Sequence, residues 1–389
     1  MKQTTTRAFA LASLLALPSL VSAGTSDTTT DAPAASPKKD DKSGFDELWG
    51  YATLYKNDAN PFIQEFKLRG RYQGQYAWVD SDQGDFDDWE NRRSRFGFDA
   101  KLFDKKIEIR LDAQSNDQWD PFYDRLVDAY IKWKPSENFS LTVGRQKAQI
   151  GYYDFLQSTN NQPTFERSQI FNQLRVDRAV GAVFEGKSGH WTWQAGVYSN
   201  DVNREWGQFE GGWSYGAGIG YDFKHAWDVE KADWRLDWLH SEHDSIDTVL
   251  NRYDDILSTS LWVKTGYWNF VTEAFYATGD TARDVFGIFF QPTYDVIPKK
   301  LQLVGRLTYT TGDGPDSVFA QSRYERAVPG ITGGGRGDEY YAAYLGLQYF
   351  IYGDKLKVLA GAEYAHLDGG GNGGDYEGVT ALTGIRLSF

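Results

Sequence analysis

The feature that most constrains this chain is a period of two in the character of its side chains, which begins near Glu65 and runs to the last residue. Successive side chains of an extended strand point to opposite faces, so this period gives each segment one apolar and one polar face. In the first segment the apolar face consists of Phe66, Leu68, Gly70, Tyr72, Gly74, Tyr76 and Trp78. Its polar face consists of Lys67, Arg69, Arg71, Gln73 and Gln75. The pattern predicts an all-β protein whose strands face a different medium on each side.

The connections between these segments distinguish a transmembrane barrel from a soluble β-sandwich, whose strands also alternate. Short turns are predicted at residues 104–105, 135–138, 187–189, 298–299 and 352–355. Long polar connections are predicted at residues 80–90, 151–174, 201–211, 242–254, 313–336 and 368–375. Short and long connections in alternation, with Trp and Tyr at the ends of the apolar faces, are typical of a barrel that spans an outer membrane.

The length of the alternating region sets the number of strands. Residues 65–389 comprise 325 residues, which at roughly 20 residues for a strand and its connection gives about 16 strands, with 14 and 18 as alternatives. The last segment places Val379, Ala381, Thr383, Ile385, Leu387 and Phe389 on one face. A final strand that ends in Phe resembles the signal read by the outer-membrane assembly machinery. We therefore predict a transmembrane antiparallel β-barrel over residues 65–389.

The residues before the barrel divide into three predicted parts. Lys2 and Arg7, an apolar run of 13 residues at positions 8–20 and a small-residue end at Ala23 predict a signal peptide over residues 1–23. The apolar run is shorter than the roughly 18 residues that a membrane-spanning helix needs. Residues 24–44 are rich in Thr, Asp, Ala, Pro and Ser and predict a disordered spacer. Residues 45–64 carry bulky side chains and predict a short periplasmic helix or plug.

Composition excludes several classes of function. The chain has no Cys, which suits a periplasm that oxidises thiols and excludes Cys-based metal sites and nucleophiles. Without residues 1–23, which hold two of the 41 basic residues and no acidic one, 39 Lys and Arg stand against 54 Asp and Glu. The resulting net charge of −15 argues against nucleic-acid binding.

The histidines and glycines give no sign of enzyme chemistry. His240 and His243 are three residues apart on a predicted strand, so they point to opposite faces and cannot share a metal ion. The glycine-rich residues 333–337 lack the Lys and Ser or Thr that open the helix of a phosphate-binding loop. We therefore expect no catalytic residue, no metal ion and no cofactor.

Three segments carry a resemblance to a known family. Residues 141–168 read LTVGRQKAQIGYYDFLQSTNNQPTFERS, a strand followed by a long loop that ends in Glu-Arg-Ser. Residues 66–73 read FKLRGRYQ, and residues 91–98 read NRRSRFGF. Together they resemble the third external loop and the first two strands of the phosphate-selective porin O and P family. The resemblance implies an anion-selective homotrimer in the outer membrane of a Gram-negative bacterium, in contact with lipid and lipopolysaccharide.

The resemblance also implies which residues bind the permeant anion. Arg92 and Arg93 match an arginine pair near the family's filter, and Arg167 matches the arginine that closes a loop folded into the lumen. Strand alternation separately places on the water face Arg69, Arg71, Arg93, Arg95, Arg110, Arg235, Arg306 and Arg386. Guanidinium suits this role because its fixed fork meets phosphate oxygens at two points and keeps its charge. The alternative is that these arginines pair with carboxylates of the lumen.

The predicted constriction loop departs from the family in its charge. The family supplies lysine near the tip of this loop, whereas residues 151–166 contain no Lys or Arg. They contain Asp154 and Glu166 instead, which we expect to be acidic groups of the constriction. The departure weakens the case for phosphate as the specific permeant.

The leading prediction is a porin for passive diffusion of small anions, phosphate among them, through an arginine-lined constriction. The first alternative is a general or carbohydrate-type diffusion porin on the same barrel, because Tyr and Trp are abundant enough to form a track for sugars. The second is a structural barrel that does not conduct. For the trimer, a close-packing outer surface is expected at Gly216, Gly218, Gly220, Ala343, Ala360 and Ala362.

Overall fold

The computed structural model describes residues 43–200, 205–206, 212–242, 252–280, 282–321, 323–331, 335–369 and 375–389. The predicted signal peptide and all but the last two residues of the predicted spacer lie outside these ranges, as does His243. Within the ranges, none of the helices combines the length and the apolar character that crossing a membrane requires.

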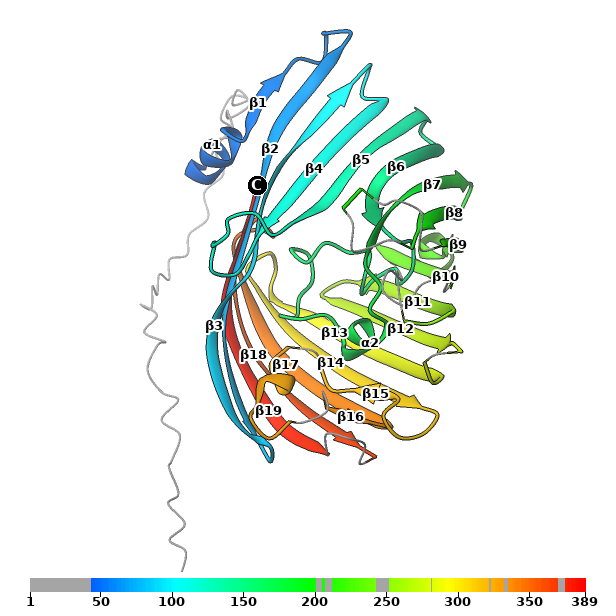
Figure 1. Ribbon diagram of the computed structural model, residues 1–389. Helices are drawn as coiled ribbons and strands as arrows, with labels where there is room; N and C mark the ends of the chain where they lie inside the picture. The colour runs from blue at the N-terminus through cyan, green and yellow to red at the C-terminus, as the bar shows by residue number, and fades with distance from the viewer. Residues whose placement is uncertain are drawn as a thin grey trace, which may run out of the picture. The chain divides into compact units, whose positions relative to one another are not determined.

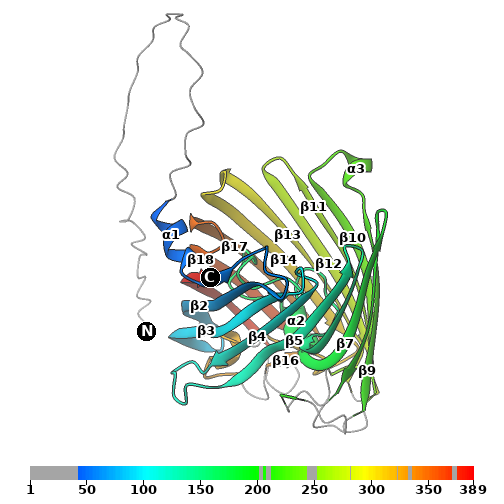
Figure 2. The ribbon, with the colours of Figure 1, turned by 90° about the horizontal axis from the view of Figure 1, so that it is seen from above.

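Sixteen antiparallel strands form a closed ring (Figures 1 and 2). They are β2 (Ile63–Ser81), β3 (Gly84–Leu102), β4 (Ile107–Ser115), β5 (Arg125–Ser136), β6 (Phe139–Lys147), β7 (Arg178–Ser188), β8 (Trp191–Ser199), β9 (Trp213–Asp222), β10 (Lys231–Ser241), β11 (Asp255–Thr265), β12 (Trp268–Thr278), β13 (Val285–Ile297), β14 (Leu301–Gly312), β17 (Glu339–Tyr352), β18 (Leu356–Asp368) and β19 (Tyr376–Ser388). Each strand pairs with the next, and β19 closes the ring by pairing with β2 from Gly378–Ser81 to Ser388–Arg71. The predicted fold class and strand number are confirmed.

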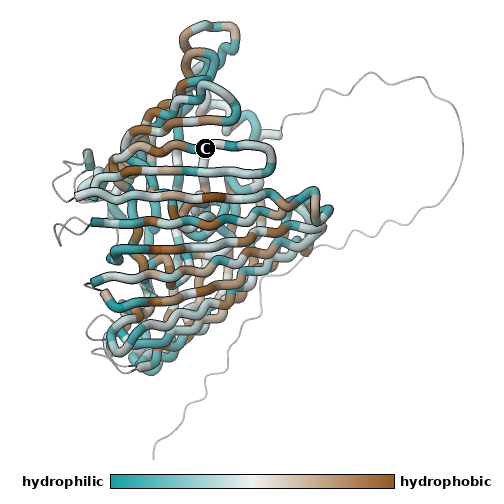
Figure 3. The backbone as a smooth tube through the Cα atoms, turned by 90° about the vertical axis from the view of Figure 1, so that its right-hand side faces the viewer, coloured by the Kyte–Doolittle hydropathy of each residue, from teal (hydrophilic) through white to brown (hydrophobic). Residues whose placement is uncertain are grey.

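The alternation of side chains explains why these segments form a barrel wall. On β14 the outward Leu307 is 59% exposed, whereas the inward Arg306 and Thr308 are 3% and 4% exposed. On β17 the outward Leu345 is 62% exposed, and its neighbour Tyr344 is 5% exposed. Figure 3 shows the same alternation as apolar and polar residues that follow one another along the strands. The apolar set thus forms the outer face of the barrel.

Two predictions about this wall are wrong. Residues 80–90 do not form a long connection, because β2 and β3 continue as a hairpin across a two-residue turn at Asp82 and Gln83. Gly84 takes a φ of 116° directly after that turn, which glycine adopts without strain. The many acidic residues of this segment made it look like a polar loop, but acidic side chains do not interrupt backbone pairing on an exposed hairpin. The glycines at 216, 218 and 220 face inward rather than outward, since their outward neighbours on β9 include the exposed Tyr215 and Ile219.

The chain before the barrel packs against the rim that carries the short turns. Helix α1 (Gly44–Gly50) begins with a capping box, in which Ser43 and Asp46 exchange hydrogen bonds. The indole of Trp49 donates to the carbonyl of Ser388 over 2.6 Å. Strand β1 (Thr53–Lys56) pairs with β2 where β19 has ended. The helix predicted within residues 45–64 thus joins the end of the last strand.

Two long connections fold into the barrel. The first, residues 148–177, carries α2 (Gln169–Leu174), and Figure 1 shows α2 inside the ring. The second, residues 313–338, carries β15 (Val318–Phe319), the 3-10 helix η1 (Glu325–Ala327) and β16 (Arg336–Gly337). A further short helix, α3 (Lys224–Trp227), lies in the turn between β9 and β10. Both long connections bury apolar side chains against the inner wall, as described below.

Apolar packing of these connections fills one side of the lumen. Ile150, Tyr153, Ile170 and Leu174 pack with inward side chains of β7 to β13. Val318, Tyr324 and Val328 of the second connection pack with Phe165 and with inward side chains of β14, β17, β18, β19 and β2. Because protein interiors are close-packed, this core narrows the lumen where it lies.

The last residue of the chain packs on a glycine, which generates a prediction. Phe389 and Gly70 exchange backbone hydrogen bonds of 3.0 and 3.3 Å, and a Cβ atom at Gly70 would lie 2.1 Å from the Phe389 ring. Gly70→Val should displace the ring and destabilise the barrel by about 1–3 kcal/mol. The measurement is the heating temperature at which the gel mobility of the barrel changes from that of the folded protein to that of the unfolded chain. The control is Thr383→Val, an outward change on β19. If Gly70→Val left the transition temperature of the barrel unchanged, the packing of Phe389 on Gly70 would not stabilise the barrel.

Candidate functional site

A large open space in the lumen is a cavity of about 1110 Å³ on the side of β2 to β7. Its lining contains sixteen Lys and Arg residues and only four Asp and Glu residues, an excess of twelve positive charges. The whole chain carries the opposite sign, with a net charge of −13. Positive charge is therefore concentrated in the cavity, where low-dielectric walls strengthen its field.

A β-bulge in the barrel wall turns two adjacent arginines into the lumen. Gln73 of β2 pairs with Arg93, whereas Gln75 pairs with Glu90, so β3 has one extra residue at this point. Strict alternation would place Arg92 on the outer face, but both Arg92 and Arg93 line the cavity. The bulge thus brings the arginine pair named by the family resemblance to one side of the lumen.

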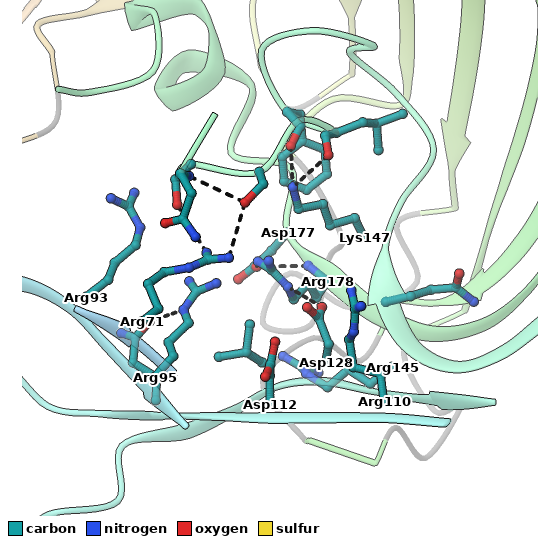
Figure 4. A pocket seen from close by; sticks show the side chains of 18 of the residues that line it. Arg71, Arg93, Arg95, Arg110, Asp112, Asp128, Arg145, Lys147, Asp177 and Arg178 are labelled. Atoms are coloured by element: carbon teal, nitrogen blue, oxygen red, sulfur yellow. Dashed lines mark hydrogen bonds and ion pairs between the residues drawn. The ribbon is translucent and has the colours of Figure 1, made fainter. Parts of the chain in front are cut away.

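Three lining arginines have no carboxylate partner among the described residues. Arg71 donates to the hydroxyl groups of Ser158 and Thr159, at 3.2 and 3.1 Å. Arg93 donates to the amide oxygen of Gln73 at 2.9 Å, and Arg95 to that of Gln114 at 3.0 Å. Figure 4 shows all three side chains reaching from β2 and β3 into the cavity. Neutral partners orient these guanidinium groups without cancelling their charge.

The other predicted arginines of this wall are neutralised. Arg69 pairs with Asp99 at 2.7 Å and with Asp112 at 3.0 Å, and Arg110 pairs with Asp99 at 2.8 Å. Arg92 forms a two-pronged pair with Glu166, at 2.7 and 3.0 Å. These three arginines thus follow the alternative that we stated from the sequence, because they pair with carboxylates of the lumen.

The inward connection of residues 148–177 contributes Arg167, Arg175 and the carboxylate of Asp177 to the cavity lining. Arg167 donates to the carbonyl of Gln157 at 3.2 Å, and its guanidinium lies 4.8 Å from the ring centre of Phe171. Its second terminal nitrogen is buried and has no hydrogen-bond partner. Burial lowers the pKa of Arg167 to about 10, with Asp154 acting in the opposite sense, so the group stays charged at neutral pH.

The two acidic residues of the loop have structural contacts. Asp154 is 4% exposed and does not line the cavity; it accepts hydrogen bonds from the backbone and hydroxyl of Ser168, at 3.3 and 2.5 Å. The expectation that Asp154 faces the constriction is therefore wrong, because its carboxylate is hydrogen-bonded to Ser168 of the same loop. Burial raises the pKa of Glu166, but the Arg92 guanidinium outweighs burial and the pKa is lowered. Glu166 thus remains ionised and cancels Arg92.

Buried charges on the wall hold the loop by its backbone. Arg386 of β19 donates to the carbonyls of Thr159, Gln162, Thr164 and Phe165 at 2.7–2.8 Å. Lys147 donates to the carbonyls of Phe155, Leu156 and Gln157 at 2.6–3.1 Å. Glu273 of β12 accepts from the backbone of Asp154 at 2.9 Å. Such hydrogen bonds to buried backbone groups fix a loop that has no regular ladder of its own.

Besides Arg69 and Arg110, three more of the eight arginines assigned to the water face by alternation do not form an open anion path. Arg306 pairs with Glu363 at 2.7 Å and donates to the Glu166 carbonyl, while Arg386 holds the loop. Arg235 lines the cavity but pairs with Asp237 at 2.6 Å. Alternation gave the face of each side chain correctly and could not give its partner.

Sequence reasoning missed lining cations at the two ends of the inward loop. They are Lys147 at the end of β6, Arg175 directly after α2 and Arg178 at the start of β7. Arg178 pairs with Asp128 at 2.8 Å. Near β6 the regular pattern breaks at Gly144, whose φ is 128°, so alternation carried no information there. The signal that could have found them is the position of cations directly beside a loop predicted to fold inward.

No metal centre accompanies this site in the described part of the chain, where no group of three or more His, Asp or Glu residues is placed to hold an ion. His240 contacts Asp255 at 3.2 Å instead.

Comparisons with known proteins give one family match and several solved structures of similar fold. A family model described as phosphate-selective porin O and P matches residues 66–226. OprB of Pseudomonas putida has 13% identity and a TM-score of 0.60, over 89% of this chain and 96% of that chain. OmpF of Salmonella typhi, in complex with daunomycin, has 14% identity and a TM-score of 0.59, over 87% and 100%. An in-vitro folded trimer form of OmpT of Vibrio cholerae has 12% identity and a TM-score of 0.53, over 83% and 99%. Curated proteins give no match.

At these identities the solved structures establish the fold, which is that of an outer-membrane porin. The resemblance read from residues 66–168 is confirmed, and the family match extends further along the chain than expected. Together the family match and the fold support the predicted location, the outer membrane of a Gram-negative bacterium, and a passive channel function.

The contacts of Arg386 generate a prediction about the loop. Arg386→Met should leave four buried carbonyls without a donor, at about 1–3 kcal/mol for each unsatisfied group, and so loosen residues 159–165. We expect a larger and noisier single-channel current and faster proteolysis within the loop. Lys357→Met is the matched control, because Lys357 is a buried cation paired across from Arg386 that contacts Asp354. Identical currents in the two variants would show that Arg386 does not anchor the loop.

Proposed function

We propose that this outer-membrane porin conducts small anions, phosphate among them, by passive diffusion through a constriction between the inward loop and the wall of β2 and β3. The observation that carries the proposal is the excess of twelve positive charges among the cavity-lining residues of a chain that is acidic overall. A field of this sign raises the local concentration of anions and lowers that of cations.

The residues proposed to carry selectivity are Arg71, Arg93, Arg95 and Arg167. Their partners are hydroxyl, amide or carbonyl oxygens, so each guanidinium retains its charge and donors for a passing anion. Arg69, Arg92 and Arg110 are paired with carboxylates and contribute less to the net field. Because residues 151–166 lack Lys and Arg, we propose a general anion preference rather than strict phosphate specificity.

A specific observation favours anions over sugars. Sugar-binding tracks use open faces of aromatic rings, but cations occupy the aromatic rings found beside this cavity. Among the rings that line the cavity, Arg167 lies 4.8 Å from the ring centre of Phe171, Arg235 lies 5.2 Å from that of Tyr152, and Arg110 lies 5.6 Å from that of Tyr130. Cation–π contacts of this kind stabilise the arginines and leave less aromatic surface for a carbohydrate.

A charge-reversal experiment tests the proposal. Arg93→Glu with Arg95→Glu should abolish or reverse anion preference, because both groups line the cavity and neither has a carboxylate partner among the described residues. The measurement is the reversal potential in a KCl gradient, repeated with added phosphate. The shift should shrink at high salt, since mobile ions screen charge over about 10 Å at 0.1 M.

The matched control changes the same charge outside the lumen. Lys299→Glu with Lys300→Glu alters the exposed turn between β13 and β14 and should leave the reversal potential unchanged. Cation preference of the unaltered protein, or equal effects of the two double variants, would refute an arginine-based anion filter. A closed protein with no current would favour a structural barrel.

We also propose that the barrel is a homotrimer, as the family resemblance implies. Of the six small residues expected to face outward, Ala343, Ala360 and Ala362 do so, on the neighbouring strands β17 and β18. Small outward side chains allow close approach of a second barrel. The predicted contact surface is therefore reduced to these strands and their neighbours.

Gel mobility of the unheated protein tests this assembly. We expect a species of three chains in mild detergent that becomes a single chain on heating, and a crosslinked trimer. Ala362→Trp should convert it to a folded monomer if the surface is correctly placed, whereas Ala217→Trp, on the exposed outer face of β9 away from β17 and β18, should not. A monomer in the unaltered protein would contradict the trimer.

A further inference from the structure

A second, smaller cavity lies at the end of the lumen that carries the short turns. It has a volume of about 510 Å³ and is lined mostly by residues of the six neighbouring strands β5 to β10. Lys132, Tyr152, Glu185 and Arg235 line both this cavity and the large one, so the two cavities adjoin. We call the smaller one the inner cavity.

The inner cavity differs from the large cavity in its charge. With His190 counted as neutral, its charged lining residues are Lys132, Lys134, Lys187, Arg235, Glu137, Glu185, Asp222 and Asp233, four of each sign. Its net charge is therefore zero, whereas the lining of the large cavity has an excess of twelve positive charges. A surface of mixed sign gives little net attraction to a simple ion, but it attracts a solute that carries both charges.

One buried carboxylate orients two polar side chains at this cavity. Oδ1 of Asp237, a residue that is 1% exposed, accepts from Nε of Arg235 at 2.6 Å and from Nε2 of Gln194 at 3.0 Å. Nε2 of Gln194 also donates to the carbonyl of Gln149 at 3.0 Å, so the orientation of the amide is fixed. Nη2 of Arg235 and Oε1 of Gln194 are buried and have no hydrogen-bond partner among the described residues. Because unpartnered polar atoms are unfavourable, a ligand with one acceptor and one donor would be stabilised here.

Glycines of β9 make room for this arrangement. Gly218 and Gly220 face inward and line the inner cavity. In the strand register Gly218 lies between Gln194 and Asp237. A Cβ atom at Gly218 would lie 2.2 Å from Oδ1 of Asp237 and 2.8 Å from Nε2 of Gln194. A larger residue would therefore push the two hydrogen-bond partners apart.

An acceptor for an ammonium group lies on the same strand as the guanidinium group. Asp233 precedes Arg235 by two residues on β10, so the two side chains share the inward face at a separation of about 7 Å. Oδ2 of Asp233 contacts Nζ of Lys231 at 3.0 Å and accepts from the hydroxyl of Tyr152 at 3.1 Å. Oδ1 has no partner among the described residues, and the side chain is 29% exposed. One carboxylate oxygen is thus available to a solute.

We propose that the inner cavity binds small zwitterions of the α-amino-acid type. The carboxylate of the solute accepts from Arg235, and its ammonium group donates to Asp233 and Gln194. A simple anion meets the carboxylates of Asp233 and Glu185 as well as the guanidinium group, and a sugar offers no charge to either sign. The inference concerns a second class of solute and does not rest on the anion preference of the constriction.

Saturation-transfer NMR tests the site in the unaltered protein, because it detects weak binding and requires no current. Detergent-solubilised barrel is titrated at neutral pH with alanine, and separately with glycerol, a neutral solute with the same number of carbon atoms. Transfer to the alanine methyl group should saturate with concentration, and glycerol should bind at least roughly tenfold more weakly. Absence of transfer to alanine, or equal transfer to the two solutes, would overturn the proposal.

Competition separates the inner cavity from the constriction. Excess inorganic phosphate, compared with chloride at equal ionic strength, should leave alanine binding unchanged, because the neutral lining of the inner cavity does not concentrate anions. Displacement of alanine by phosphate would assign alanine to the arginines of the large cavity and overturn the inner site. The result does not depend on whether the constriction selects anions.

Two substitutions give an independent measurement. Asp233→Asn removes the charge that accepts the ammonium group, and Arg235→Lys keeps a charge beside Asp237 but removes Nη2. Each should raise the Kd of alanine roughly tenfold. Asp295→Asn is the matched control, since Asp295 of β13 accepts from Gln302 at 2.7 Å and lines neither cavity. Heat-modifiable gel mobility shows whether each variant is folded, and unchanged alanine affinity in both folded variants would contradict the site.

Discussion

The constraint on which the rest of this structure depends is that backbone polar groups facing lipid must be paired within the protein. The ring of sixteen strands meets it, because β19 pairs with β2 over most of its length and leaves no open edge there. Closure in turn fixes an inside and an outside for every strand. The outer face is apolar because it meets lipid, and the inner face is free to hold arginine, glutamine and carboxylate side chains.

The lumen of this barrel is asymmetric, and the asymmetry concentrates its charge. Two inward connections bury Ile150, Tyr153 and Ile170 against one part of the wall and Val318 and Tyr324 against another. A cavity of about 1110 Å³ lies along β2 to β7, and most of its lining cations come from these strands. An apolar core inside the barrel therefore does more than narrow the channel, because it directs solute past one charged wall.

Period-two alternation was sufficient to predict the fold class, the strand number and the inner face of Arg71, Arg93 and Arg95, since each depends only on local sequence. It failed where backbone geometry departs from a regular strand, at the bulge that turns Arg92 inward and at Gly144. It also could not tell a charged residue that is free from one that is paired. Asp154 and Arg386 show this limit: their partners, Ser168 and the loop carbonyls, come from tertiary folding.

The contacts of Arg386 have a consequence for the order of folding. They join β19 to Thr159, Gln162, Thr164 and Phe165 of the inward loop, from which Arg386 is separated by 221 to 227 positions in the sequence. Contacts of such sequence separation form late, because a long segment must first be ordered. The final position of the loop therefore depends on closure of the ring, because the donor to four of its carbonyls belongs to the strand that pairs with β2.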